Sequence, residues 1–305
     1  MRIRLAIAIT ALAAFGLTVS GSARPPEKAR LLTAYGWSEE LDGFGGISAL
    51  ELGPDGSSFF AVTDRTLLLQ GRLQRGDSGE VTGVTLTGSH ELLTPAGKPL
   101  TGWRRDSEGL ALRGDGLLYV SFEAGAKVWA YPDPQGPATR LPDHPDFNDM
   151  PGNAALEALA IDARGHLYTV PEAPLRRSED LPLYRYDGTE WRIVQHITPS
   201  DRFAPVGADF GPDGLFYLLE RNFGGIGFRS RVRRFDLADF DPKGEVLFTS
   251  ALGQHDNLEG LSVWRDGTGQ IRLTMVSDDN FKFFQRTEIV EYALTETLAK
   301  APLSH

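Results

Sequence analysis

The sequence predicts an all-β protein that folds as a β-propeller of five four-stranded blades, closed into a ring by an N-terminal strand. Three observations support this prediction. A pattern of about fifty residues occurs five times, a glycine marks each copy at a similar place, and no long amphipathic helix interrupts the pattern. A period of this length is typical of propeller blades and is too long for most helical repeats. Six blades is the alternative, and a β-sandwich is less compatible because it predicts no fixed period.

Each copy begins with an apolar strand, passes through a turn and returns in a second apolar strand that ends at a carboxylate. These strand pairs with their terminal acids span residues 47–64, 108–123, 157–172, 206–220 and 259–278. The glycines expected in the turns are Gly56, Gly116, Gly165, Gly214 and Gly267. Glycine between two such apolar runs favours a β-hairpin, because it tolerates the positive φ that hairpin turns need.

The outer strands of each blade follow in order. Third strands are expected at residues 66–73, 127–131, 183–187, 231–237 and 288–294, and fourth strands at 81–93, 138–141, 191–197 and 246–250. The fifth copy has no fourth strand of its own. Residues 29–37, which precede the first copy, can supply it and close the ring. Residues 132–153 are rich in proline and aspartate and predict a long surface loop within one blade.

The N-terminus has the features of an export signal. Arg2 and Arg4 precede an apolar run at residues 5–19, and Gly21-Ser22-Ala23 offers small residues for cleavage. The run is short for a helix that spans a bilayer, although an uncleaved anchor is the alternative. We therefore expect residues 1–23 to be a signal peptide and residues 24–305 to form one propeller domain. The mature protein is expected to be periplasmic or secreted, monomeric and not inserted in a membrane.

Composition limits the chemistry. The formal net charge is −10, and loss of residues 1–23 removes two further positive charges. This charge disfavours binding to nucleic acid and to anionic membranes. The chain contains no cysteine, which excludes disulfides, thiolate metal sites and a cysteine nucleophile.

Two sets of acidic residues are expected to meet at one mouth of the central channel. In a propeller the first strand of a blade runs away from this mouth and the second strand returns to it. Three copies begin strand one with glutamate, at Glu108, Glu157 and Glu259, where the other two have Ser48 and Val206. The acids that end strand two are Asp64, Glu123, Glu172, Glu220 and Asp278.

Carboxylates crowded in this way either have raised pKa values or bind a cation. Because the donors are all oxygens, we expect Ca²⁺, with Mg²⁺ as the alternative. All eight acids are candidate ligands, and the three strand-one glutamates are the candidate catalytic residues. The alternative is that each acid accepts backbone N–H bonds from a neighbouring blade. Arg65, Arg221 and Lys282 follow strand-two acids and are candidates for binding a small anionic substrate.

Five short motifs carry a resemblance to a known family. They are DSEGL at 106–110, ALEAL at 155–159, PVGADF at 205–210, NLEGL at 257–261 and SDDNF at 277–281. As a set they resemble the phytase-like family of exported bacterial proteins, whose domain carries the description "esterase-like activity of phytase". The resemblance implies a phosphoester or ester hydrolase. Similarity to calcium-dependent propeller phytases is looser, so the resemblance does not imply phytate as the substrate.

Together these observations predict an exported, metal-dependent hydrolase of phosphoesters or related esters that acts at the acidic channel mouth. A metal-dependent lactonase is one alternative, because such enzymes also use acidic ligands at a propeller channel. A binding or scaffold propeller with a structural metal is the non-enzymatic alternative, since one fold hosts many functions.

Export gives the first testable prediction. We expect the mature chain to begin within a few residues of Arg24, because the apolar run and the small residues before it form a cleavable leader. Intact-mass measurement of protein purified from its native host should show loss of the leader. A full-length chain recovered from the cytoplasm would contradict this prediction.

Overall fold

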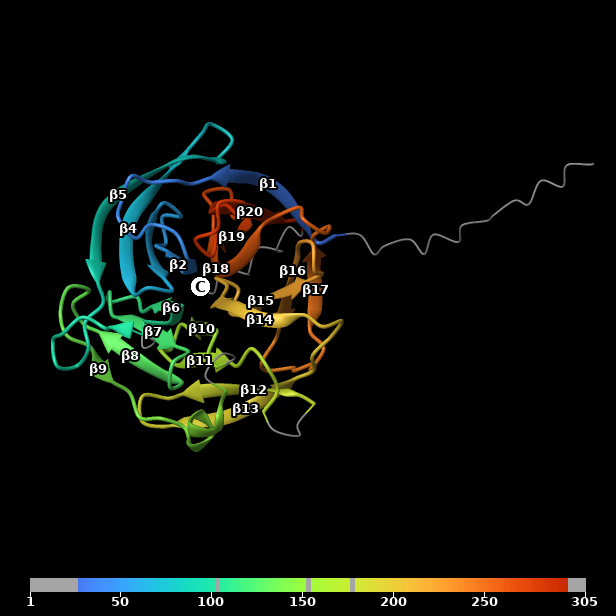
Figure 1. Ribbon diagram of the computed structural model, residues 1–305. Helices are drawn as coiled ribbons and strands as arrows, with labels where there is room; N and C mark the ends of the chain where they lie inside the picture. Colours follow the sequence, from blue (N-terminus) through green and yellow to red (C-terminus); the bar gives the residue numbers. More distant parts are fainter. Residues whose placement is uncertain (1–26, 103–104, 152–154, 176–178, 296–305) are drawn as a thin grey trace, which may run out of the picture.

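The computed structural model describes residues 27–102, 105–151, 155–175 and 179–295. These residues form twenty strands in five four-stranded antiparallel sheets. The sheets surround a central axis, and the first strand of each repeat lies innermost (Figure 1). The prediction of a five-bladed propeller is therefore confirmed, and the six-bladed and sandwich alternatives are wrong. The predicted signal peptide lies outside the described residues. Among those that are described, no helix is long and apolar enough to span a membrane.

The first three blades are built from consecutive strands. Blade one contains β2 (Ile47–Leu52), β3 (Ser58–Thr63), β4 (Leu67–Arg75) and β5 (Val81–Glu91). Blade two contains β6 (Ser107–Leu112), β7 (Leu118–Phe122), β8 (Lys127–Tyr131) and β9 (Thr139–Arg140). Blade three contains β10 (Ala158–Ile161), β11 (Leu167–Val170), β12 (Leu181–Tyr186) and β13 (Trp191–Ile197).

The last two blades complete the ring. Blade four contains β14 (Ala204–Phe210), β15 (Phe216–Phe223), β16 (Phe228–Phe235) and β17 (Glu245–Thr249). Blade five contains β18 (Asn257–Arg265), β19 (Ile271–Asp278), β20 (Glu288–Leu294) and, from the other end of the chain, β1 (Ala29–Gly36). Most strand boundaries lie within a few residues of those expected, because alternation of apolar residues marks strands that pack against neighbouring blades.

The hairpins between first and second strands have a common turn geometry. In blade three, Ile161 pairs with Leu167 across the turn. Asp162 accepts backbone N–H bonds from Arg164 and His166, both at 2.9 Å, and Gly165 has a φ of 85°. The same positive φ occurs at Gly56, Gly116 and Gly214. In blade five it occurs at Gly269, so the expectation of Gly267 was wrong: the longer strands β18 and β19 place the turn two residues later.

The hydrophobic core lies between the blades. Five clusters of buried apolar side chains each combine residues of two neighbouring blades. One cluster joins Trp264 of blade five to Leu50 of blade one, so that packing continues across the junction of the two chain ends. The loop of residues 132–153 also contributes, because Phe147 is buried against Tyr184 and Trp191. This segment is thus partly core rather than the surface loop expected.

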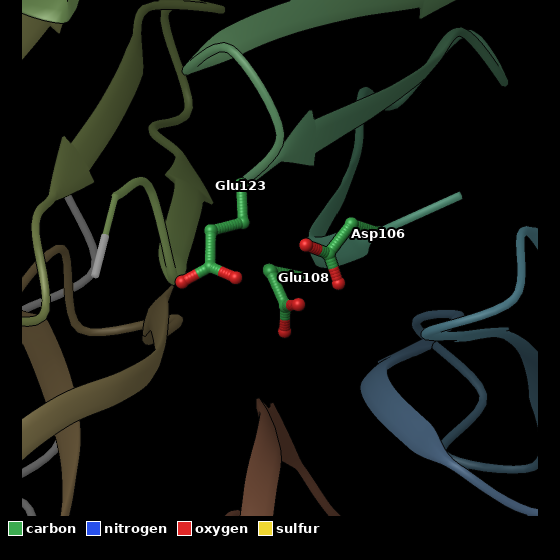
Figure 2. Close-up of side chains that lie close together, drawn as sticks. All are labelled: Asp106, Glu108 and Glu123. Carbon is green, nitrogen blue, oxygen red and sulfur yellow. The ribbon is translucent and has the colours of Figure 1, made fainter. Parts of the chain in front are cut away.

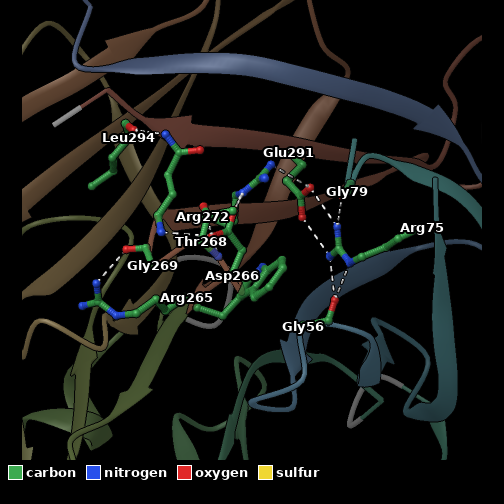
Figure 3. Close-up of polar contacts among 12 residues, drawn as sticks. Gly56, Arg75, Gly79, Arg265, Asp266, Thr268, Gly269, Arg272, Glu291 and Leu294 are labelled. Atoms are coloured by element: carbon green, nitrogen blue, oxygen red, sulfur yellow. Dashed lines mark hydrogen bonds and ion pairs between the residues drawn. The ribbon is translucent and has the colours of Figure 1, made fainter. Parts of the chain in front are cut away.

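Strand β1 closes the ring. It pairs antiparallel with β20 from Ala29↔Leu294 to Gly36↔Glu288, which confirms the prediction for the N-terminal segment. At the end of the axis where the turns between first and second strands lie, an ion pair joins blades one and five (Figure 3). Arg75 of β4 donates from Nη1 and Nη2 to the two carboxylate oxygens of Glu291 in β20, both at 2.9 Å. The Glu291 side chain is fully buried, so this contact connects the interiors of the first and last blades.

The closure predicts unequal roles for two arginines of β4. Arg75→Met should lower the free energy of unfolding by about 3 kcal/mol, because it leaves the buried Glu291 carboxylate without its main partner. Arg72→Met is the matched control. Arg72 pairs with Asp55 at the surface, with 56% of its side chain exposed, so its loss should cost less than about 1 kcal/mol. Urea unfolding midpoints measure both, and equal losses would contradict the assignment of Arg75 to ring closure.

Candidate functional site

A β-bulge presents the strand-one residues to the channel. The register between first and second strands shifts between Ser107 and Leu110 in blade two and between Leu258 and Gly260 in blade five. Glu108 and Glu259 lie in these shifts. Blades one and four have the same irregularity. A bulge leaves its extra residue out of the regular ladder and can redirect its side chain, so the repeat places equivalent side chains around one axis.

Small residues let the first strands approach this axis. A Cβ on Gly207 would lie 2.2 Å from the carbonyl oxygen of Glu259, and a Cβ on Gly109 would lie 2.9 Å from that of Glu157. Glycine is therefore required where the backbones of neighbouring blades meet. The cavity on the axis is lined by Ser48, Glu108, Glu157, Val206 and Glu259, among others. It has about 10 Å³ open to the centre of a water molecule, close to the space needed for one water.

Blade two contributes the tightest group of carboxylates. Asp106 precedes β6, Glu108 lies in β6 and Glu123 follows β7 (Figure 2). One carboxylate oxygen from each lies within 4.8 Å of the other two. The Glu123 N–H donates to the Asp106 carbonyl at 3.0 Å, which fixes the ends of the two strands side by side. Three oxygen donors at this separation can hold a hard divalent cation.

The electrostatics of the site reflect its crowding. Burial raises the pKa of Glu108 well above its ordinary value, and Glu157 and Glu259 raise it further. Burial and the adjacent Asp106 raise the pKa of Glu123 to about 8. Burial is also the main cause of the raised pKa of Glu259, which is about 8. Each of these carboxyls would release its proton more readily if a cation were bound nearby.

A second pair of acids lies where blades one and five meet. Burial and the charge of Asp278 raise the pKa of Asp64 to about 7, and burial raises that of Asp278 to about 6. Oδ1 of Asp64 is buried and has no hydrogen-bond partner among the described residues. The neighbouring Asp279 is occupied, since its Oδ1 accepts N–H bonds from Gly46 at 2.9 Å and from Phe281 at 3.0 Å.

Arg221 is the cation at the centre of the acids. Its Nη1 donates to Asn257 Oδ1 at 2.8 Å and also to Glu259, while Nη2 donates to Glu172 at 3.2 Å. Burial opposes the charge of Arg221, but Glu259, Glu157 and Glu172 outweigh it and raise the pKa of the guanidinium. Arg221 therefore joins blades three, four and five and neutralises part of the acidic charge.

Glu220 does not join the acidic group, contrary to the expectation that it is a metal ligand. Its carboxylate is fully buried between Arg231 and Arg233, with Arg233 Nη2 at 2.6 Å and Arg231 Nε at 2.9 Å. The reason is that β15 continues through Phe223, so Glu220 lies inside a strand rather than at its end. Successive side chains of a strand point to opposite faces, and Arg221 takes the place at the mouth.

The other predicted residues lie as follows. Seven of the eight expected acids interact through space or line the cavity: Asp64, Glu108, Glu123, Glu157, Glu172, Glu259 and Asp278. Arg65 is exposed and stacks over Phe281, with the guanidinium carbon 3.4 Å from the ring centroid. Lys282 lines a larger cleft beside the acids. Asp106 and Asn257 were not among the expected site residues. The Asp-x-Glu and Asn-x-Glu spacings at the start of strand one are the signal that could have identified them.

The chain belongs to the phytase-like family. The family model described as "Esterase-like activity of phytase" matches residues 42–281, which include blades one to four and the strands β18 and β19 of blade five. None of the curated protein sequences matches this chain significantly.

Solved structures with a similar fold are distant in sequence. An aldose sugar dehydrogenase from Streptomyces coelicolor, in its PQQ-bound form, is 14% identical with a TM-score of 0.46, covering 88% of this chain and 100% of that one. The gluconolactonase XC5397 from Xanthomonas campestris is 15% identical with a TM-score of 0.41, covering 77% and 68%. A virginiamycin B lyase from Staphylococcus aureus is 11% identical with a TM-score of 0.39, covering 82% and 71%. Similarities at this level do not distinguish among functions.

The raised pKa values predict how stability depends on pH. Glu123 and Glu259 have an ordinary pKa of 4.5 and a pKa of about 8 in the folded protein. Between these values the folded state binds more protons than the unfolded state, so stability falls as pH rises. In EDTA, the melting temperature should decrease from pH 5 to pH 8.5. Glu259→Gln, which cannot ionise, should flatten this dependence. A melting temperature that rises over this range would contradict the raised pKa values.

Proposed function

We propose that the protein is a Ca²⁺-dependent hydrolase of phosphoesters or related esters, acting at the acidic mouth of the channel. The observation that carries the proposal is the convergence of Asp106, Glu108 and Glu123 within 4.8 Å. Glu157 and Glu259 line the adjoining cavity. Family membership supports hydrolysis of an ester, because the matching model is described by an esterase-like activity.

The residues present suit a hard cation. The acids at the mouth offer carboxylate oxygens, and burial together with their mutual repulsion raises the pKa values of Glu108 and Glu157. Asp64 Oδ1 is buried without a hydrogen-bond partner among the described residues, as expected of an oxygen that binds an ion. Ca²⁺ accepts six to eight oxygens in flexible geometry, whereas Mg²⁺ requires near-octahedral geometry and retains several waters. Carboxylates from several blades therefore favour Ca²⁺, with Mg²⁺ as the alternative.

Asp106, Glu108 and Glu123 would hold the ion, and Glu157 and Glu259 would complete its surroundings. When bound, such a cation polarises a phosphoryl or carbonyl oxygen and lowers the pKa of water. A carboxyl that lies too far from the ion to be deprotonated by it can donate its proton to a departing alkoxide. Arg221 holds Glu172 and Glu259 in place. Arg65 at the rim remains suited to an anion, because a stacked guanidinium still presents its N–H edge.

Activity and metal binding can be tested together. Wild-type protein should hydrolyse 4-nitrophenyl phosphate or 4-nitrophenyl acetate in Ca²⁺, and EDTA should abolish the activity. Ca²⁺ should also raise the melting temperature, because a ligand that binds only the folded state stabilises it. Glu108→Gln should weaken Ca²⁺ binding by about 100-fold, as expected when a metal's surroundings lose a charged partner. Isothermal titration measures that loss.

Glu190→Gln is the matched control, since Glu190 is an exposed residue that pairs with Arg192 at the outer edge of blade three. Its activity and Ca²⁺ affinity should equal those of the wild type. Turnover of gluconolactone without turnover of either ester would favour a lactonase. Ca²⁺ binding without any turnover would favour a binding or scaffold propeller. Absence of Ca²⁺, Mg²⁺ and Mn²⁺ binding would leave the acids as structural groups and contradict the proposal.

A further inference from the structure

A cleft of about 880 Å³ opens beside the acidic site, between blades four and five. Its walls come from the β15–β16 turn, the loop before β18 and the loop between β19 and β20. It shares Glu172, Arg221 and Asn257 with the acidic site, so the two are continuous. Its volume is in the range of small-molecule sites. A ligand in the cleft would therefore reach the carboxylates.

Cations with spare hydrogen-bonding capacity line this cleft. Arg202 and Lys282 are exposed there, and neither has an ion-pair partner among the described residues. Arg286 also lines the cleft but pairs with Glu288. Asp256 is occupied, because it accepts bonds from the Gln285 side chain and the Arg286 backbone, both at 3.0 Å. The cleft therefore offers two free positive charges to an anion.

The rim of the cleft is apolar and exposed. Phe223 is 60% exposed, Ile226 is 90% exposed and Phe284 is 69% exposed, and all three line the cleft. Large apolar side chains gathered at the edge of a pocket mark a surface that binds an apolar group. Arg202 and Lys282 alone would suit any anion, whereas this rim distinguishes among anions.

One buried residue of the cleft, His255, is uncharged at neutral pH. His255 is buried, with Nε2 2.8 Å from the Tyr292 hydroxyl. Burial and the nearby Arg286 lower the pKa of His255 to about 4. His255 Nδ1 has no hydrogen-bond partner among the described residues. His255 thus adds a neutral polar ring to the cleft and no further positive charge.

We propose that this cleft binds an amphipathic anion, such as an aryl or branched-alkyl phosphomonoester. Arg202 and Lys282 would contact the anionic group, and Phe223, Ile226 and Phe284 would cover the apolar group. A polyphosphorylated polyol is a poorer fit, because it needs many cations and no apolar rim, and because the adjacent carboxylates repel extra negative charge. The inference rests on the proposed function for its choice of phosphoester.

Non-hydrolysable phosphonates test the cleft without turnover. Isothermal titration in Ca²⁺ and in EDTA should show that phenylphosphonate binds about tenfold more tightly than methylphosphonate, because the phenyl ring buries apolar surface. Ile226→Ser should reduce this ratio severalfold and leave methylphosphonate binding unchanged. Lys282→Gln should weaken both ligands alike, and added salt should do the same.

Two matched controls keep the test specific. Ile193→Ser changes an exposed isoleucine on the outer strand of blade three, and Lys98→Gln changes an exposed lysine between blades one and two. Neither should alter the binding of either phosphonate. Equal affinities for the two phosphonates, or no effect of Ile226→Ser, would overturn the inference. Because titration requires no hydrolysis, a preference for phenylphosphonate would support the cleft even if no ester were turned over.

Discussion

The pairing of β1 with β20 is the contact on which the rest of the molecule depends. It joins the two ends of the chain in one sheet and so holds blade five against blade one. That junction brings Asp64 of blade one close to Asp278 of blade five. The buried ion pair of Arg75 with Glu291 secures the same junction at the end of the axis opposite the acidic mouth. A propeller with an open edge would expose unpaired strand groups, and its first strands would not converge.

The site and the scaffold use charge in opposite ways. Glu220 is enclosed by Arg231 and Arg233, so its charge is compensated within blade four. Glu108 and Glu259 are also buried or nearly so. Among the described residues, the strong positive charge that lies beside these acids is that of Arg221. Uncompensated carboxylates destabilise a fold. A cation bound at the mouth, as the proposed function requires, would compensate their charge. Acids with shifted pKa values are common at functional sites.

Much of the fold was predictable from the sequence because the repeat encodes it. The predicted bounds of strands such as Trp191–Ile197 and Glu288–Leu294 agree with the structure at both ends, because each copy of the repeat has the same alternation of apolar residues. The site was predictable to the extent that it follows the repeat, as Glu157 does. The prediction for Glu220 was wrong because β15 is longer than expected, which places Glu220 inside the strand. The repeat pattern does not indicate the length of a strand. The cleft between blades four and five was not foreseen, because many of its residues, such as Ile226 and Phe284, lie in loops outside the repeated strand pattern.

The narrow axis has a consequence for how such a molecule can diversify. Each blade contacts its two neighbours. Repeat architectures of this kind can therefore gain or lose a copy and keep the same type of interface between neighbouring copies. Here a sixth copy would enlarge the circle of first strands and separate glutamates that now meet across a space close to that of one water molecule. The number of blades is thereby tied to the size of the cavity on the axis. New specificities would have to arise by exchange of side chains and loops on one face, with the count of five left unchanged.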